Sequence, residues 1–162
     1  MKFSDLCFIR IIDPNFFRLI PKYLVEQIKN RDFEVDKLYE LAPLLLTIPF
    51  IGPQGRIVAV PNPFHQFYAL ATEAGKAKGF LWLTIDPLRQ RICINVLSVD
   101  REYQDESEPT ALKGTVDFIR TLPEYEKFKK PIMCSTQTPK IFEEQIGAKR
   151  SKEILMEVDY GL

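Results

Sequence analysis

Residues 96–122 decide the predicted fold and read VLSVDREYQDESEPTALKGTVDFIRTL. The stretch begins as an apolar strand and ends as an amphipathic helix, and Asp105, Glu106 and Glu108 surround Ser107 between them. A loop that runs from a strand into a helix N-terminus presents backbone N–H groups and a positive dipole end, where anions commonly bind. The acidic residues at this junction are therefore unexpected, because they place negative charge where an anion would otherwise bind.

Two apolar runs come before this stretch and overlap its beginning. They are GFLWLTI (79–85) and RICINVLSV (91–99), and the turn-forming sequence DPLRQ joins them. Runs of this composition on either side of a short turn predict an antiparallel hairpin. Because both runs are apolar almost throughout, we expect central strands that are covered on both faces.

After the acidic residues, Leu112, Val116 and Ile119 recur on one face of a predicted helix. The rest of the chain predicts a buried strand at PIMCST (131–136), a helix at TPKIFEEQIG (138–147) with Thr138 as its cap, and a last strand at EILMEVDY (153–160). The last predicted strand is centred near Leu155.

The first half predicts a strand at Leu6–Ile12, followed by a helical segment with Pro14 in its first turn. At Pro21 this segment is either kinked or split into a short turn and a helix that begins at Pro21. Asp36 is the predicted cap of a second helix. Three further segments are assigned as a loop at IPFIGPQG (48–55), a strand at RIVAV (56–60) and a stretch open between helix and strand at 64–79. The element order predicts one α/β (α+β) domain over residues 1–162, with helices on the faces of a mixed sheet.

Composition narrows the classes of partner. The chain has 22 basic and 22 acidic residues, interspersed along its length, so neither nucleic acid nor an anionic membrane surface is an indicated partner. Cys7, Cys93 and Cys134 lie in apolar runs, which predicts reduced, buried core residues. No signal peptide or apolar span of about 20 residues is evident, so we expect a soluble, cytoplasmic protein.

The element order and two motifs resemble the GCN5-related N-acetyltransferase family. The family's pyrophosphate loop has the form V-x-P-x-x-(Q/R)-x-x-G-x-(G/A), with a leucine in the following helix turn. Val99, Gln104 and Leu112 match this pattern, whereas Ser107 and Pro109 replace the two glycines. The resemblance implies an acyl-CoA N-acyltransferase-like fold that binds acetyl-CoA between two splayed parallel strands. The cofactor-binding residues it implies are Leu97, Ser98, Val99, Gln104, Asp105, Glu106, Ser107, Glu108 and Pro109.

The second motif is the family's F-Y-E-K-L-G-F, in which the tyrosine often protonates the leaving thiolate. Residues 142–148 read FEEQIGA, so Glu143 stands at the tyrosine position. On the strand where the family often carries a carboxylate base, Asn95 and Ser98 are the only polar side chains after Cys93. The catalytic residues therefore stay unassigned, and no metal-ligand spacing is evident.

Helix initiation alone also explains the acidic loop. Under this interpretation Ser107 caps the helix, Glu106 and Glu108 complement its dipole, and Pro109 lies in the first turn. His65, the only histidine, is a candidate base or a structural residue. Phe80 and Trp82 are expected in the core, whereas the aromatic residues at 64–68 are candidates for a pocket.

The resemblance predicts transfer of an acyl group from acetyl-CoA to an amine carried by a small molecule or a protein. A catalytically inactive protein of the same fold, with a binding, structural or interaction role, is the alternative. A third hypothesis is a sensor that binds a ligand other than CoA in the same cleft.

Overall fold

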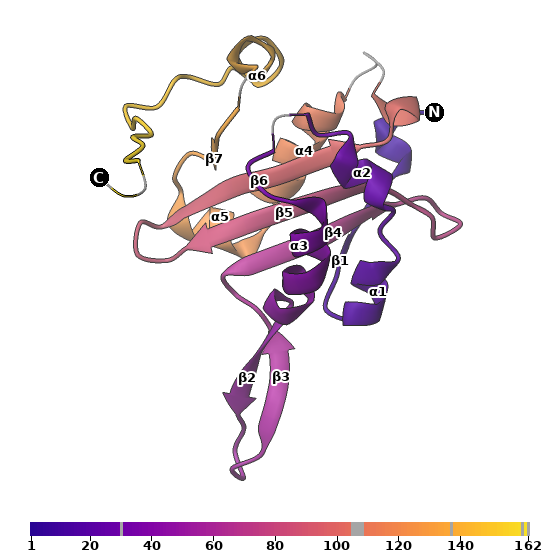
Figure 1. Cartoon of the computed structure of the whole chain (residues 1–162), viewed down its shortest axis with the longest axis vertical. Helices are drawn as coiled ribbons and strands as arrows, with labels where there is room; N and C mark the ends of the chain where they lie inside the picture. The colour runs from indigo at the N-terminus through magenta and orange to yellow at the C-terminus, as the bar shows by residue number, and fades with distance from the viewer. Residues whose placement is uncertain (30, 105–108, 137, 160, 162) are drawn as a thin grey trace.

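A five-stranded mixed sheet forms the centre of the protein, with strands in the spatial order β1-β4-β5-β6-β7 and helices on both faces (Figure 1). The computed structural model describes residues 1–29, 31–104, 109–136, 138–159 and 161. Neighbouring strands are antiparallel except β6 and β7, which are parallel. The strand bounds are Cys7–Arg10 (β1), His65–Ala71 (β4), Ala77–Asp86 (β5), Arg91–Val99 (β6) and Met133–Cys134 (β7). The predicted fold class is confirmed.

Proline sets the starts of the first two helices. Asp13 caps α1 (Pro14–Arg18), because its Oδ1 accepts a hydrogen bond from the Asn15 N–H at 2.8 Å. Pro21 ends this segment and is itself the N-cap residue of α2 (Lys22–Glu26). Of the two alternatives at Pro21, a kink or a split, the structure has the split.

The third helix, α3 (Val35–Leu41), has Glu34 rather than the predicted Asp36 at its N-cap. Asp36 lies in the first turn, and its carboxylate Oδ1 is 3.1 Å from Nζ of Lys22 on α2. A short 3-10 turn, η2 (Ala42–Leu45), follows the helix. The predicted cap was wrong because the helix begins before Asp36, whose carboxylate forms an ion pair with Lys22 of α2 and does not cap the helix.

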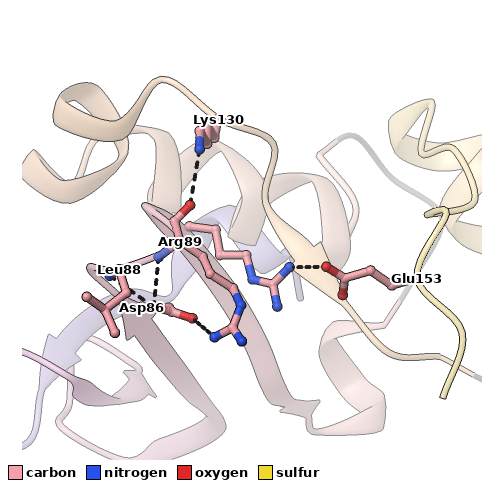
Figure 2. Close-up of polar contacts among 6 residues, drawn as sticks. Asp86, Leu88, Arg89, Lys130 and Glu153 are labelled. Atoms are coloured by element: carbon pink, nitrogen blue, oxygen red, sulfur yellow. Dashed lines mark hydrogen bonds and ion pairs between the residues drawn. The ribbon is translucent and has the colours of Figure 1, made fainter. Parts of the chain in front are cut away.

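The β5–β6 hairpin is confirmed, and its turn is held by Asp86 (Figure 2). The Asp86 carboxylate accepts hydrogen bonds from the backbone N–H groups of Leu88 (3.1 Å) and Arg89 (3.0 Å) and from Nη1 of Arg89 (2.9 Å). These bonds, first of all the one from the Arg89 backbone, lower the pKa of Asp86. Lys130 Nζ donates to the Arg89 carbonyl at 3.2 Å and joins the turn to the second half of the chain.

Two apolar clusters cover the two faces of the sheet. The helices α1 to α3 pack on one face, through a cluster that includes Phe17, Leu24, Leu38, Phe67, Phe80 and Val96. The N-terminal turn η1 (Phe3–Asp5) and the later helices cover the other face, through a cluster that includes Phe3, Leu70, Leu81, Leu83, Val99 and Ile119. Strand β5 and the second half of β6 are therefore covered on both faces, as predicted, whereas Asn95 in the middle of β6 is exposed.

A separate two-stranded hairpin, β2 (Thr47–Ile51) and β3 (Ile57–Pro61), projects away from the sheet (Figure 1). The prediction of a loop at 48–55 was wrong for residues 48–51, which pair with β3. Prolines and glycines suggested a loop, but Pro49 lies in the strand itself. The segment left open at 64–79 contains strand β4 and the turn that leads into β5.

The described part of the second half contains three α-helices: α4 (Ala111–Arg120), α5 (Pro123–Phe128) and α6 (Pro139–Ile146). Helix α5 was not predicted. Helix α6 is confirmed, with Thr138 at its N-cap position and Gly147 ending it at φ 65°. The Thr138 side chain makes no capping hydrogen bond there.

The predicted last strand at 153–160 is wrong for residues 153–159, which form no regular element. Four apolar side chains of this segment are strongly exposed, including Leu155 at 96%. Its start is fixed by Glu153, whose Oε1 lies 2.6 Å from Nη1 of Arg91 on β6 (Figure 2). The β7 strand is also shorter and more exposed than predicted, so the sheet ends in a two-residue edge.

The cysteines are free thiols, but the prediction that they are buried was wrong. Cys7 and Cys134 are exposed and Cys93 is half-buried. The two exposed cysteines lie on the edge strands β1 and β7, whereas Cys93 lies on β6 between two paired strands.

Candidate functional site

The candidate site lies where β6 and β7 diverge. Their parallel register consists of Cys93 opposite Met133 and Ile94 opposite Cys134, and it stops there. At the same point β6 carries a bulge against β5, because Trp82 pairs with Val96 and Leu83 pairs with Ile94. Asn95 is the extra residue. A bulge bends its strand and increases its twist, which turns the second half of β6 away from β7.

The open edge of β6 presents backbone groups to this gap. The Asp100 N–H donates to the Lys78 carbonyl of β5 at 2.8 Å, so alternate residues Ser98 and Val96 also exchange hydrogen bonds with β5. The N–H and C=O groups of Leu97 and Val99 therefore point away from β5. No strand in the described part of the chain pairs with them.

Two glutamines close the end of this edge. Nε2 of Gln27, the last residue of the α2 turn, donates to the Val99 carbonyl at 2.8 Å. Nε2 of Gln104 donates to the same carbonyl at 2.5 Å. With the Val99 carbonyl occupied, three outward backbone groups of these two residues still face the gap: the Leu97 N–H, the Leu97 carbonyl and the Val99 N–H.

A pocket of about 360 Å³ lies at this position. It is formed by the end of α2, the second half of β6 and the 3-10 turn η3 (Arg101–Tyr103). Its described lining has one cationic side chain and no carboxylate: Gln27, Ile28, Leu97, Ser98, Val99, Arg101 and Gln104. A larger hollow of about 540 Å³ lies between α2 and α3, but its lining is mainly charged helix-end and loop residues and does not reach the sheet.

Ser98 is buried, and its hydroxyl is already bonded on both sides. It donates to the Leu24 carbonyl of α2 and accepts from Gln27 Nε2 at 2.5 Å. Ser98 thus joins the C-terminal end of α2 to β6 and gives the pocket one of its walls. Its hydroxyl proton is committed to a backbone acceptor, so this residue holds the site together.

An ionic cluster lies beside the pocket, at the first residue after β6. The Tyr23 hydroxyl donates to Oδ2 of Asp100 at 2.5 Å, and Nζ of Lys78 lies 3.7 Å from the same oxygen. The Tyr23 bond, followed by the bond from the Glu102 backbone, lowers the pKa of Asp100. The same hydrogen bond raises the pKa of Tyr23 to about 12. Asp100 therefore stays ionised and Tyr23 neutral at physiological pH.

The predicted cofactor residues divide into three groups. Leu97, Ser98, Val99 and Gln104 all line the pocket. Pro109 is half-buried just before the helix, and the predicted residues Asp105, Glu106, Ser107 and Glu108 lie outside the described residues.

The helix after the acidic loop begins later than the sequence suggested. Thr110 is its N-cap, and its Oγ1 accepts a hydrogen bond from the Lys113 N–H at 3.2 Å. Helix α4 itself starts at Ala111, so Pro109 lies before the cap and not in the first turn. The assignment of Ser107 as the helix cap was therefore wrong. A threonine at Ncap supplies the same kind of side-chain acceptor three residues further on.

His65 belongs to a polar row across the face of the sheet that α1 to α3 cover. It pairs with Thr84 of β5, and Asn95 Nδ2 donates to the Thr84 hydroxyl. Trp82 Nε1 donates to His65 Nδ1 at 3.2 Å, so the imidazole proton resides on Nε2. Burial lowers the pKa of His65, which keeps the ring neutral at pH 7. Its basic nitrogen is thus already occupied by the tryptophan.

The aromatic residues predicted as core or pocket mostly belong to the core. Phe80 is fully buried, and Trp82 stacks on Phe67 with ring centroids 5.4 Å apart. Phe64 is 47% exposed and does not join them. At the second motif, Glu143 lies on α6, and its Oε1 is 3.4 Å from Nε of Arg150. A carboxylate in this ion pair is ionised and cannot donate the proton that the family's tyrosine gives to the leaving thiolate.

Sequence reasoning missed Gln27, Ile28 and Arg101 as pocket residues. Gln27 lies 71 positions before Ser98, and only tertiary packing brings them together. Arg101 had a local signal, because it is the only basic residue between Asp100 and Pro109. A search of the described residues finds no group of three or more metal-ligating side chains, and none of their helices is long and apolar enough to cross a membrane.

Comparison with solved structures identifies the fold. A possible acetyltransferase from Clostridium difficile 630 superposes with a TM-score of 0.63 over 95% of each chain, at 12% identity. The chain has an acetyltransferase fold. A proposed acetyltransferase from Deinococcus radiodurans R1 matches with a TM-score of 0.53 at 14% identity, over 97% of this chain and 91% of that one.

The acetyltransferase fold is also shared with YycN, a proposed acetyltransferase from Bacillus subtilis. That structure matches with a TM-score of 0.53 at 15% identity, over 94% of this chain and 98% of the other. No protein-family profile and no curated protein sequence matches the chain. The acyltransferase-like fold predicted from the two motifs is therefore confirmed by structure.

Proposed function

We propose that this protein binds an acyl-CoA along the open edge of β6 and transfers the acyl group to an amine. One observation carries the proposal: the β6–β7 pairing stops at Ile94, which leaves the outward groups of Leu97 and Val99 beside a pocket of about 360 Å³. An open strand edge binds an extended, amide-containing chain through its backbone, as in strand addition. The pantetheine arm of CoA is such a chain.

The residues around the pocket fit the rest of the cofactor. Leu97 and Ile28 supply apolar surface, and the amide groups of Gln27 and Gln104 supply polar contacts. Arg101 places a guanidinium at the end of β6, where phosphates are held without the two glycines of the family loop. The Thr110-capped start of α4 follows in the chain, and a helix start favours an anion.

When bound, acyl-CoA supplies a thioester whose carbonyl carbon the amine nitrogen attacks, and the C–S bond breaks as the proton lost by the amine passes to the thiolate. The protein positions these groups. The Leu97 and Val99 N–H groups align the extended arm, and the bulge at Asn95 turns the strand so that the reacting end meets the polar row of His65 and Thr84. The amine approaches over this row.

Among the residues that the structure describes, those that line this path provide no free base. Ser98 donates to a carbonyl, His65 accepts from Trp82, and the described pocket lining has no carboxylate. The amine therefore has to reach the thioester in its neutral form. The rate should follow the ionisation of the amine itself, and it should rise with pH until the amine is fully deprotonated.

A second candidate is an acyl-CoA-binding protein without transfer activity. The observation that favours it is Glu143, which stands at the position of the family's tyrosine acid and is paired with Arg150. Both candidates require cofactor binding at the same pocket. They differ only in turnover, which a thiol-release assay with a panel of amines measures.

Calorimetric titration with acetyl-CoA tests the binding on which both candidates depend. We expect saturable heat, and at one hundred times the dissociation constant an increase in unfolding free energy of about 2.7 kcal/mol. Arg101→Gln should weaken binding about fivefold, since it removes an exposed charge-assisted contact. Arg120→Gln, on the exposed end of α4, is the matched control and should bind as the wild type does. Absence of heat at millimolar acetyl-CoA would refute the proposal.

A further inference from the structure

The β2–β3 hairpin exposes apolar side chains on both of its faces. Phe50 is 56% exposed and Val58 44% exposed on one face, whereas Ile51 is 71% and Ile57 76% exposed on the other. The hairpin extends beyond the sheet and its helices (Figure 1). A two-stranded hairpin alone in water is at best marginally stable, and contiguous exposed apolar surface marks an interaction site.

The projection is a fixed feature, because the hairpin is anchored at its root by Asn62. This residue is 4% exposed. Its backbone N–H donates to the Leu46 carbonyl at 3.1 Å, and its Nδ2 donates to the Leu45 carbonyl at 2.9 Å. Its own carbonyl accepts from Arg10 Nη2 of β1 at 2.6 Å, which joins the root to the main sheet.

The hairpin is adapted for contacts through its faces and not through its edges. The bonds from Gly52 N–H to Arg56 and from Asn62 N–H to Leu46 bracket the ladder, so odd-numbered residues of both strands point their backbone groups outward. Pro49 on β2 and Pro61 on β3 are at such positions, and each removes an outward N–H. Proline on an edge strand opposes the addition of a further strand. A partner therefore packs against side chains.

The chemistry of this surface selects an uncharged partner. From Leu41 to Phe64, Arg56 at the hairpin tip is the only charged residue, although charged residues make up 27% of the chain. The apolar exposure continues onto the root, where Leu44 is 74% and Phe64 47% exposed. Arg56 alone offers too little positive charge to hold nucleic acid, phosphate or an acidic peptide, whereas a second copy of the same surface is complementary in polarity.

The size of the surface favours reciprocal packing. Five residues per strand give a length of about 17 Å, so one face covers roughly 170 Å², far below the approximately 800 Å² per partner of a stable interface. A two-fold arrangement lets the arm of each copy cover the root of the other, so each partner contributes both its arm and its root to the interface. We propose that the β2–β3 hairpin is a dimerisation arm that packs through its apolar faces onto the arm and root of a second copy of this chain.

Sedimentation equilibrium of the full chain tests whether the β2–β3 hairpin mediates dimerisation. We expect a mass of two chains at tens of micromolar, and the variant Phe50→Glu with Ile57→Glu should weaken the dimer at least one-hundredfold. Leu155→Glu and Leu88→Glu change exposed apolar residues elsewhere in the chain, at 96% and 93% exposure, and should leave the dimer unchanged. A monomeric wild-type chain, or a dimer lost in Leu155→Glu and kept in the arm variant, would overturn the proposal.

Hydrogen exchange of the wild-type chain provides a readout that does not depend on any variant's folding. The amides of β2 and β3 that bond across the hairpin, such as those of Phe50 and Val58, should exchange more slowly as protein concentration is raised through the dissociation constant, because a partner packed on the faces opposes opening of the hairpin. Exchange at these amides that is independent of concentration, in a sample whose mass doubles, would place the dimer contact elsewhere and overturn the assignment.

Discussion

The Tyr23 hydroxyl lies 2.5 Å from Oδ2 of Asp100, and this bond joins α2 to the residue that follows β6. Gln27 and Ser98 make a second connection between the same two elements, one helical turn further along α2. The pocket lies between these connections and η3. Its shape therefore depends on how firmly α2 is held against the end of the central strand.

Tyr23→Phe should lower the free energy of unfolding by about 1 kcal/mol, because it removes a hydrogen bond to a carboxylate at a partly exposed position. Urea unfolding at pH 7 measures this change. Asp36→Asn removes a strongly exposed carboxylate from the Lys22 pair and is the control, with an expected change below about 0.5 kcal/mol. A Tyr23→Phe variant as stable as the wild type would show that this bond does not hold α2.

The same pair predicts how stability depends on pH. Asp100 has a lowered pKa in the folded state, so its contribution is present above the unfolded value of about 3.9 and is lost as the pH falls through the folded value. Tyr23 has a pKa raised to about 12, so its contribution is complete below about pH 10 and is lost between pH 10 and 12. Unfolding titrations of the wild type and Tyr23→Phe should converge at both extremes. A constant difference across the whole range would contradict this.

Gln27→Glu should destabilise the protein by about 1–3 kcal/mol. The amide Nε2 donates to both Ser98 Oγ and the Val99 carbonyl, and a carboxylate would place an acceptor against an acceptor. Gln145→Glu on the exposed face of α6 makes the same chemical change without a buried partner and should be nearly neutral. Thermal unfolding of both variants at pH 7 compares them. Equal melting temperatures would argue against the role assigned to Gln27.

Gly114→Ala should destabilise the protein, although alanine favours helix. A Cβ at this position would lie 2.4 Å from Cε1 of Phe3, which is itself buried in the core. Overpacking costs about 1–3 kcal/mol, which exceeds the gain of about 1 kcal/mol in helix propensity. Asp117→Ala on the exposed face of the same helix lacks this clash and is the comparison in urea unfolding. A more stable Gly114→Ala variant would mean that the Phe3 ring moves at little cost.

The sequence predicted the centre of the fold because local chemistry determines it. Apolar β-rich runs with a turn-forming junction specify the β5–β6 hairpin. Pro14 and Pro21 each mark the start of a helix, because proline fits the N-terminal end of a helix and not its interior. The pocket residues Leu97, Ser98, Val99 and Gln104 followed from one contiguous motif. Gln27 was beyond this reasoning because no local pattern indicates which helix end packs on which strand.

The wrong secondary-structure predictions concern segments at the edges of the fold, and each has a physical cause. A strand needs a hydrogen-bonding partner, and the apolar-rich segment at 153–159 finds none among the described strands, so its apolar side chains remain exposed. Pro49 indicated a loop, yet proline is compatible with a strand when its missing N–H would point outward. Such positions are distinguished by pairing register, which composition does not reveal.

Amide chemical shifts of the ¹⁵N-labelled chain report on whether acyl-CoA binds at the open edge of β6. Titration with acetyl-CoA should perturb the N–H signals of Leu97 and Val99 and the side-chain amide of Gln104, with a common dissociation constant. Amides of the β2–β3 hairpin should not move. Shifts confined to other surfaces, or none at millimolar acetyl-CoA, would show that this edge does not bind the cofactor.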